Sequence, residues 1–299
     1  MIVARVPATS ANLGAGFDCL GLALRLHNDV ALIPEGPFRV EISGEGSDTL
    51  PRDRANLVAR TVLRFHDVIG RPAPPFSLRM LNRIPMTGGL GSSSTAIVGG
   101  LLVANRLAGD PLSRADLLRV ALEIEGHPDN VAPAMLGGLV LSVAQGGRLT
   151  TVQIPVPDGL RAVIFLPGFT ISTREARRRL PARVPLEDAV FNVGRAALFV
   201  AAMATGRLEL LRTATQDRLH QPYRQVLFPA MPRLFEAALG AGALGAWLSG
   251  AGSALMALAP DDAAPIVDAF ERAARMNGVA GHALAVDLSA TGAEILDQD

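Results

Sequence analysis

Glycine and hydroxyl residues crowd into residues 85–95, a stretch whose composition suits phosphate binding. Its three glycines let the backbone approach a ligand closely and adopt positive φ. Its hydroxyl residues open an apolar segment, 95–107, that is predicted to be helical. A helix start offers unpaired N–H groups and the positive end of the helix dipole to an anion. The predicted phosphate loop consists of Pro85, Met86, Thr87, Gly88, Gly89, Leu90, Gly91, Ser92, Ser93, Ser94 and Thr95.

The alternative for this stretch is an ordinary helix N-cap after a flexible loop. One cap would explain one serine, but it would not explain three glycines followed by four hydroxyl residues. The common phosphate loop requires a lysine, and all 28 basic residues of this chain are arginine. The G-x-G-x-x-G dinucleotide fingerprint is not present in the stretch either. Backbone amides, the helix dipole and a metal ion are therefore expected to hold the phosphates.

A second polar cluster follows a predicted helix that Ser113 caps. That helix carries Glu123 and Glu125, and it leads into a proline-fixed segment, 126–133, which contains His127, Asp129 and Asn130. Loops on rigid scaffolds often carry function, so this segment is a candidate part of a site. The alternative is a polar loop that only caps the helix.

Four further segments are candidate parts of a site. Asn12 and Asp18 lie in a long turn of small residues, where turn formation is the competing explanation. Residues 173–179 contain four arginines, for which a solvated basic helix face is the usual interpretation. Residues 220–224 end in Arg224, and residues 249–253 form a second glycine loop between two apolar strands. That second loop is expected to pack closely, with the first loop as one partner.

Composition limits the classes of function. The chain has 299 residues, of which 49% are hydrophobic, so it can bury a large core. The formal net charge of zero gives no support for nucleic acid or an anionic membrane as a partner. The lone Cys19 suits a reducing cytoplasm. We expect no signal peptide. We also expect no membrane span, because no apolar stretch of about 18 residues suggests one.

Hydrophobic periodicity predicts alternating strands and helices in two domains, 1–158 and 159–299. Strands are expected at 2–6, 22–33, 39–43, 76–84, 160–166, 243–249, 254–259 and 282–286, and another is expected within 135–143, after Gly137 and Gly138. Helices are expected at 56–68, 95–107, 113–125, 186–204, 207–219, 231–239 and 262–275.

Six motifs, in order along the chain, resemble the homoserine kinase family of the GHMP kinase superfamily. Residues 85–95 match the central P-x-x-x-G-L-G-S-S motif of the superfamily, and residues 249–253 resemble its C-terminal glycine motif. Relatives that act on mevalonate or galactose carry a basic residue near the N-terminus. Here residues 7–18 instead follow the homoserine kinase pattern, as do residues 125–133, 172–177 and 220–224.

The resemblance implies an α+β fold with two domains. The first would be an ATP-binding domain like ribosomal protein S5, with a left-handed β-α-β crossover, and the second a ferredoxin-like domain. It also implies transfer of the γ-phosphoryl group of ATP to the side-chain hydroxyl of L-homoserine, giving O-phosphohomoserine for threonine synthesis.

Site roles are carried over by motif position. Asn56 would lie near the adenine, and Ser93 and Glu123 would hold Mg²⁺, with Ser92 and Glu125 as rivals. The catalytic candidates are Asp18, His127 and Asn130, without a firm general base. The residues expected around the amino acid are Asn12, Asp18, His127, Asp129, Asn130, Thr173, Arg177 and Arg224.

The chemistry of these residue types agrees with a zwitterionic substrate. Arginine suits a carboxylate, which points to Arg177 and Arg224 as a clamp. Asp18, Asp129 and Asn130 can accept from an ammonium group. Two alternatives stay open: a kinase for another small alcohol, such as shikimate or mevalonate, and a regulatory protein that kept only the nucleotide loop. The oligomeric state is also open, with a homodimer as one alternative.

Overall fold

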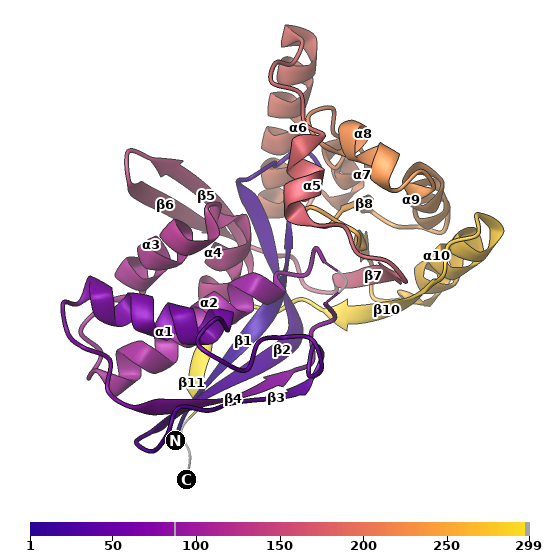
Figure 1. The fold of residues 1–299 in the computed structure, drawn as a ribbon. Helices are drawn as coiled ribbons and strands as arrows, with labels where there is room; N and C mark the ends of the chain where they lie inside the picture. Colours follow the sequence, from indigo (N-terminus) through magenta and orange to yellow (C-terminus); the bar gives the residue numbers. More distant parts are fainter. Residues whose placement is uncertain (87, 297–299) are drawn as a thin grey trace.

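A computed structural model describes residues 1–86 and 88–296, which form two layered halves around separate sheets (Figure 1). The larger sheet has the order β11-β1-β2-β4-β3, and β5 extends it by pairing with β2 and β6. Its strands are β1 (Ile2–Ala11), β2 (Leu20–Pro34), β3 (Val40–Gly44), β4 (Phe76–Asn82), β5 (Leu139–Gln145), β6 (Arg148–Ile154) and β11 (Glu294–Leu296).

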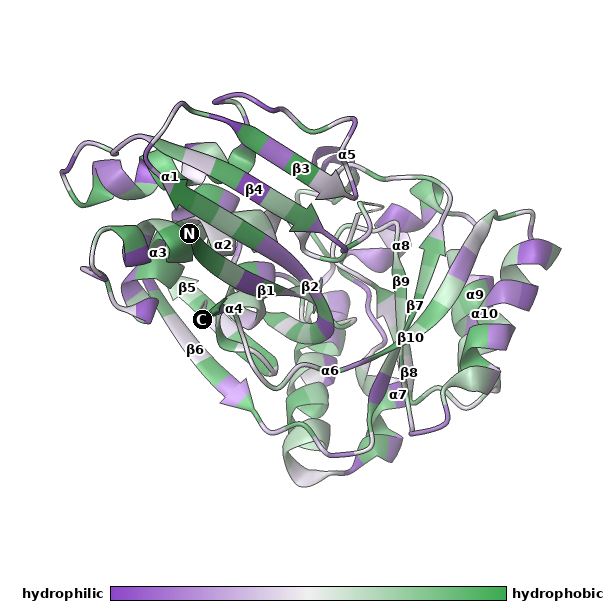
Figure 2. Cartoon of the chain, turned by 90° about the horizontal axis from the view of Figure 1, so that it is seen from below, coloured by the Kyte–Doolittle hydropathy of each residue, from purple (hydrophilic) through white to green (hydrophobic). Residues whose placement is uncertain are grey.

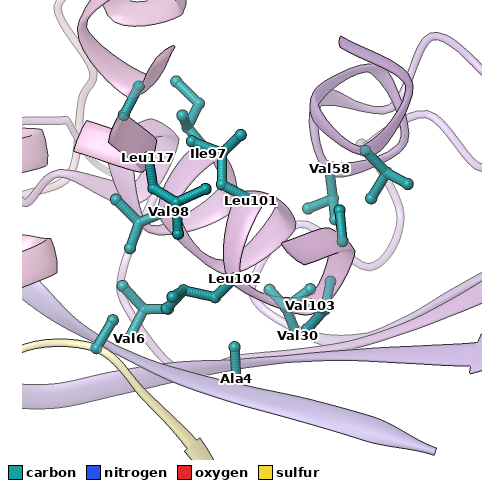
Figure 3. Close-up of a cluster of buried hydrophobic side chains, with 14 of the residues drawn as sticks. Ala4, Val6, Val30, Val58, Ile97, Val98, Leu101, Leu102, Val103 and Leu117 are labelled. Atoms are coloured by element: carbon teal, nitrogen blue, oxygen red, sulfur yellow. The ribbon is translucent and has the colours of Figure 1, made fainter. Parts of the chain in front are cut away.

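Four helices cover one face of this sheet (Figures 1 and 2). They are α1 (Leu57–Val68), α2 (Ser92–Leu107), α3 (Arg114–Glu125) and α4 (Pro128–Leu136). Helix α2 lies at the centre, where Val98, Leu101 and Leu102 pack onto Val6 and Val30 of the sheet (Figure 3). Burying such side chains stabilises the fold by about 1.5–3 kcal/mol each. The start of α2 is therefore fixed relative to β1 and β2.

The second half is built on an antiparallel sheet of order β10-β7-β9-β8. Its strands are β7 (Arg161–Pro167), β8 (Gly245–Leu248), β9 (Leu255–Ala259) and β10 (Gly281–Asp287). Its helices are α5 (Thr173–Arg178), α6 (Leu186–Thr205), α7 (Leu211–Ala214), α8 (Gln221–Arg224), α9 (Met231–Gly240) and α10 (Ala264–Met276), with short 3₁₀ turns at Leu208–Leu210 and Gln225–Leu227.

Alternation along β7 assigns its two faces to different cores. Val163 and Phe165 pack with α9 and α10, whereas Ala162 and Ile164 join a cluster shared with the first half of the chain. Trp247 lies in that shared cluster, and its indole N–H donates to Ser10 Oγ at 3.0 Å. The shared apolar core holds the two halves against each other.

Several sequence predictions need correction. The segment 126–133 is not a loop, because α4 begins at Pro128, and proline suits the first position of a helix. The helix predicted at 207–219 breaks into a 3₁₀ turn and the short α7. Strands β6 and β11 were not predicted. Because β11 pairs with β1, the end of the chain returns to the first sheet. The domain boundary at 158 falls between β6 and β7 and stays a prediction.

Helix α6 has an unusual composition for a surface helix. Within the described residues it is the one helix long and apolar enough to cross a membrane, a test that core helices of soluble proteins also pass. It carries Glu187, Asp188 and Arg195, and its buried face packs into the apolar cluster that the two halves share.

Candidate active site

One cavity of about 360 Å³ lies between the two halves and gathers nearly all of the predicted site residues. Its size falls within the range of small-molecule sites. The predicted residues that line it are Asn12, Asp18, Asn56, Pro85, Met86, Gly88, Gly89, Leu90, Gly91, Ser92, Ser93, Thr95, Glu125, His127, Asp129, Asn130, Thr173, Arg177 and Arg224. Ser94 is fully buried beside it, and Thr87 lies outside the described residues.

The glycine loop is shaped by contacts with other parts of the chain. Gly88, Gly89 and Gly91 have φ of 87°, 88° and 67°, which side chains disfavour. A Cβ on Gly91 would collide with Thr9 Oγ1, and one on Gly88 would lie 2.6 Å from the carbonyl oxygen of Gly252. The second glycine loop packs on the first as expected. The same contacts explain why glycine is required at these positions.

The first turn of α2 opens into the cavity. Its N-cap is Gly91 in a left-handed conformation, so no side chain caps the helix. The N-cap alternative for the serines therefore does not hold, since all of them lie inside the helix. The first backbone N–H groups of this helix have no intrahelical acceptor. They can bind an anion without help from lysine or arginine.

A carboxylate faces the same turn. Glu125 Oε1 accepts from Ser93 Oγ at 2.8 Å and from Ser94 Oγ at 3.0 Å. Glu123 is exposed outside the cavity and pairs with Arg64 at 3.3 Å. This placement argues against Glu123 as a metal ligand and favours its rival Glu125. In residues 1–86 and 88–296 no group of three or more His, Cys, Asp or Glu could hold a metal by itself.

An apolar pocket adjoins the glycine loop. Val30, Leu50, Leu57 and Met80 line this part of the cavity. Asn56 is also there, but its side chain caps α1: Oδ1 accepts from Val58 N at 2.9 Å, and the amide donates to Pro51 O at 2.9 Å. The sequence did not single out these apolar residues, because isolated hydrophobic residues on strands and loops look like ordinary core.

The polar end of the cavity is built around the turn after β1. Asn12 and Asp18 both have positive φ, 70° and 57°, and Asn12 Oδ1 accepts from the Asp18 N–H at 3.0 Å. The Asp18 carboxylate accepts two bonds from Arg177, at 2.8 and 3.1 Å. The hydrogen bonds that Arg177 donates to Asp18 raise the pKa of Arg177. The predicted turn residues thus bridge the two halves.

Arg224 is a buried cation in the same end of the cavity. Its Nη1 donates to Gly250 O at 2.8 Å and to His220 Nδ1 at 3.2 Å, while its Nε has no partner. Across the described residues no carboxylate forms an ion pair with it within 4.0 Å. Burial, followed by the charge of Arg177, lowers its pKa to about 10. A buried guanidinium in this state suits an anionic ligand.

His220 positions this arginine, a role that sequence reasoning missed. It is fully buried, and its Nε2 lies 2.8 Å from Gly14 O, which can only accept. The proton is therefore on Nε2, and Nδ1 accepts from Arg224. Burial lowers the pKa of His220, which keeps it neutral. The ring stacks on Phe17 at 5.1 Å. The sequence signal that could have found His220 was the motif at residues 220–224, which resembles the homoserine kinase family. No role was predicted for the histidine itself.

The three polar residues at the start of α4 form one chain. His127 Nδ1 lies 3.0 Å from Asp129 Oδ1, and Asn130 Oδ1 accepts from Thr9 Oγ1 at 2.8 Å. The hydrogen bond to Asp129 raises the pKa of His127, against the opposing effect of burial. This region is therefore a helix start whose side chains face the cavity.

Helix α5 separates one arginine from its neighbours. Thr173 and Arg177 line the cavity, whereas Arg174, Arg178 and Arg179 lie outside it on an exposed face. The solvated-face interpretation therefore describes three of the four arginines in the run. Arg177 differs because its phase on the helix turns it toward Asp18.

Comparisons with known proteins agree with this geometry. The family models for the GHMP kinases N terminal domain and the GHMP kinases C terminal match residues 56–138 and 199–275. The homoserine kinase of Moorella thermoacetica is 47% identical over 257 residues, which cover 86% of this chain and 87% of that protein. That of Desulfitobacterium hafniense is 40% identical and is matched over 99% and 100%.

Solved structures extend the comparison to the fold. The crystal structure of homoserine kinase from Cytophaga hutchinsonii has a TM-score of 0.88 at 31% identity, covering 99% of this chain and 97% of that one. Mevalonate kinase from L. major shares the fold alone, with a TM-score of 0.69 at 16% identity.

The fold and the glycine-loop cavity place the chain in the GHMP kinases, which are ATP-dependent kinases of small molecules. Within that class it belongs to the homoserine kinase family. The predicted family, two-domain α+β fold and enzyme class are thereby confirmed.

Proposed function

We propose that the protein transfers the γ-phosphoryl group of ATP to the side-chain hydroxyl of L-homoserine. The observation that carries this proposal is the pairing of two features in one cavity: an open helix start at one end and the buried, uncompensated Arg224 at the other. The first suits phosphate and the second suits the carboxylate of an amino acid. The product, O-phosphohomoserine, would serve threonine synthesis in the cytoplasm.

ATP would lie along the glycine loop. The adenine would occupy the apolar pocket of Val30, Leu57 and Met80, and the phosphates would meet the first turn of α2. Ser93 and Glu125 supply a hydroxyl and a carboxylate oxygen in contact with each other, and both suit Mg²⁺. The ion itself would neutralise phosphate charge, and its remaining ligands would come from phosphate and water.

Homoserine would lie between the two halves. Its carboxylate would bind Arg224 and Arg177, and its ammonium group would bind Asp18, which already contacts Arg177. Asn12, Asp129, Asn130 and Thr173 would complete the enclosure. Binding would thus replace the one ion pair between Arg177 and Asp18 with three ion pairs to the ligand.

Catalysis would rest on positioning and electrostatic stabilisation, as phosphoryl transfer generally does. Asp18 is engaged by Arg177, and the raised pKa of His127 favours its protonated form. Neither is a strong general base in this state. A protonated His127 beside Asp129 would instead add positive charge near the reacting phosphoryl group.

A panel of alcohols tests the proposal. The kcat/KM measured from ADP release should be highest with L-homoserine and much lower with shikimate or mevalonate. An amino alcohol that lacks the carboxylate should also be a poor substrate. A higher kcat/KM with mevalonate than with homoserine would show that homoserine is not the substrate. ATP binding without turnover of any alcohol would favour a regulatory protein.

A further inference from the structure

Phe17 is a large aromatic side chain that lies outside the apolar core. It is half-buried in the turn between β1 and β2, directly before Asp18. It belongs to none of the three hydrophobic clusters formed by residues 1–86 and 88–296, and it does not line the cavity. Ordinary core packing therefore does not account for this ring, and its partners are polar and charged instead.

Three side chains of the candidate site meet at the ring of Phe17. The guanidinium carbon of Arg224 lies over the ring at 5.3 Å from its centre, and that of Arg177 lies over it at 5.7 Å. The imidazole of His220 stacks on the same ring, with 5.1 Å between centres and 24° between planes. A cation within about 6 Å of an aromatic ring centre is attracted by the negative face of the ring.

The two arginines need a partner of this kind because they carry like charges. Burial, and then the charge of Arg177, lower the pKa of Arg224 to about 10. The printed hydrogen bonds of Arg224 go to Gly250 O and His220 Nδ1, which are both uncharged when the histidine is neutral. Two nearby cations repel each other most strongly where water is scarce. The ring of Phe17 attracts both of them from one place and so offsets part of this repulsion.

We propose that Phe17 is a positioning residue of the carboxylate clamp. Its ring holds Arg177 and Arg224 beside each other before a ligand arrives, so binding orders fewer side chains. This inference rests on the proposed function, in which the ammonium group of homoserine binds Asp18 and the carboxylate binds Arg177. Asp18 alone holds Arg177 in the free protein by two hydrogen bonds. Once the ligand engages both partners, the contact with Phe17 remains to keep Arg177 in place.

Two substitutions of Phe17 separate the ring from its apolar bulk. Phe17→Leu keeps an apolar side chain and removes the ring, whereas Phe17→Tyr keeps the ring. Phe17→Leu should raise KM for homoserine about tenfold and change kcat and KM for ATP less than about twofold, because the lost contacts hold only the clamp. Phe17→Tyr should stay close to the wild type. If Phe17→Tyr loses as much as Phe17→Leu, the ring face is not what holds the arginines, and the proposal fails.

Phe38→Leu is the matched control. Phe38 is also half-buried and also lies beneath an arginine, with the guanidinium carbon of Arg54 at 5.2 Å from its ring centre. It packs on the core of the first half and does not line the cavity. This variant should leave KM for homoserine and KM for ATP unchanged. A rise in KM for homoserine equal to that of Phe17→Leu would mean that loss of any such ring disturbs the site, and it would overturn the proposal.

A double-variant cycle measures the contact without a substrate. The Tm is compared among the wild type, Phe17→Leu, Arg177→Ala and the protein with both changes. Phe17→Leu should lower the Tm less in the Arg177→Ala background, because one of its contacts is already absent there. The lost bonds to Asp18 cancel, since both proteins of that background lack them. Equal shifts in the two backgrounds would refute the contact, whichever alcohol is the substrate.

These measurements distinguish the role of Phe17 from the proposed function. A wild-type protein that does not phosphorylate homoserine would contradict the proposed function, and the Tm cycle would still decide whether Phe17 holds Arg177. A wild-type protein that phosphorylates homoserine with the same KM as Phe17→Leu would refute the role of Phe17 and leave the proposed function standing.

Discussion

Removing the guanidinium of Arg177 tests the proposed carboxylate clamp against a matched neighbour. Arg177→Ala removes a side chain that lines the cavity and binds Asp18 in two places. Arg178→Ala removes an arginine from the next position on the same helix, where it is exposed outside the cavity. The two variants change net charge equally, so a difference between them reports the position of Arg177 in the cavity and its bonds to Asp18.

The expected loss follows from burial. Truncating one partner of a buried, hydrogen-bonded charge pair costs about 2–5 kcal/mol. The side chain of Arg177 is 37% exposed, so water partly replaces it and the lower end applies. A loss of about 2 kcal/mol corresponds to roughly a 30-fold lower kcat/KM. Truncation of the deeply buried Arg224 should cost a free energy at the upper end of this range.

Steady-state kinetics with varied homoserine at saturating ATP measures this effect. Arg177→Ala should lose about 30-fold in kcat/KM, and Arg178→Ala should change it less than twofold. The loss should shrink for an amino alcohol without a carboxylate, because that molecule never uses the clamp. Equal and small effects of the two variants would refute the assignment, since Arg177 would then behave as part of a solvated face.

Three further outcomes are expected. Glu125→Gln should reduce kcat at least tenfold and raise the Mg²⁺ concentration needed for activity, whereas Glu123→Gln should behave like the wild type; the reverse pattern would restore Glu123 as the ligand. Gly91→Ala should weaken ATP binding measured by calorimetry. It should also lower the free energy of unfolding by about 1–2 kcal/mol, and with it the Tm, because of the left-handed φ at Gly91 and the collision of a Cβ with Thr9. An unchanged Tm would mean that alanine is not strained at this position. His220→Gln should raise KM for homoserine about tenfold with little change in KM for ATP, because it removes one bond to a charged group; a parallel rise in both constants would indicate general disruption.

The sequence alone predicted those parts of the fold and site that have a distinctive local composition. The loop at 85–95 stood out because glycines and hydroxyl residues follow one another without interruption. Helix α6 was predicted within one residue of its observed bounds, because its apolar composition is continuous and Gly206 ends it. The expectation that the second glycine loop packs on the first was also correct.

Other features depend on contacts that sequence alone does not carry. Glu123 and Glu125 are two positions apart on α3, so they point to different sides, and only the packing of α3 decides which side meets α2. The same holds for Arg177 and Arg178 on α5. Strand β11 is three residues long and gains its structure from pairing with β1. The expectation that glycines of this loop allow close approach to phosphate stays a prediction, and the contact between Gly91 and Thr9 on β1 is a second reason for glycine that the sequence did not show.

Phosphorus NMR of the reaction product tests the central claim most directly. Incubation of the protein with ATP, Mg²⁺ and L-homoserine should give one new phosphomonoester signal, coupled to the protons of the terminal CH₂ group of homoserine. That result requires the phosphoryl group to reach the side-chain hydroxyl while the carboxylate is held by the arginines. A signal from an acyl phosphate, or ADP and inorganic phosphate alone, would contradict the proposed orientation of the substrate in the cavity.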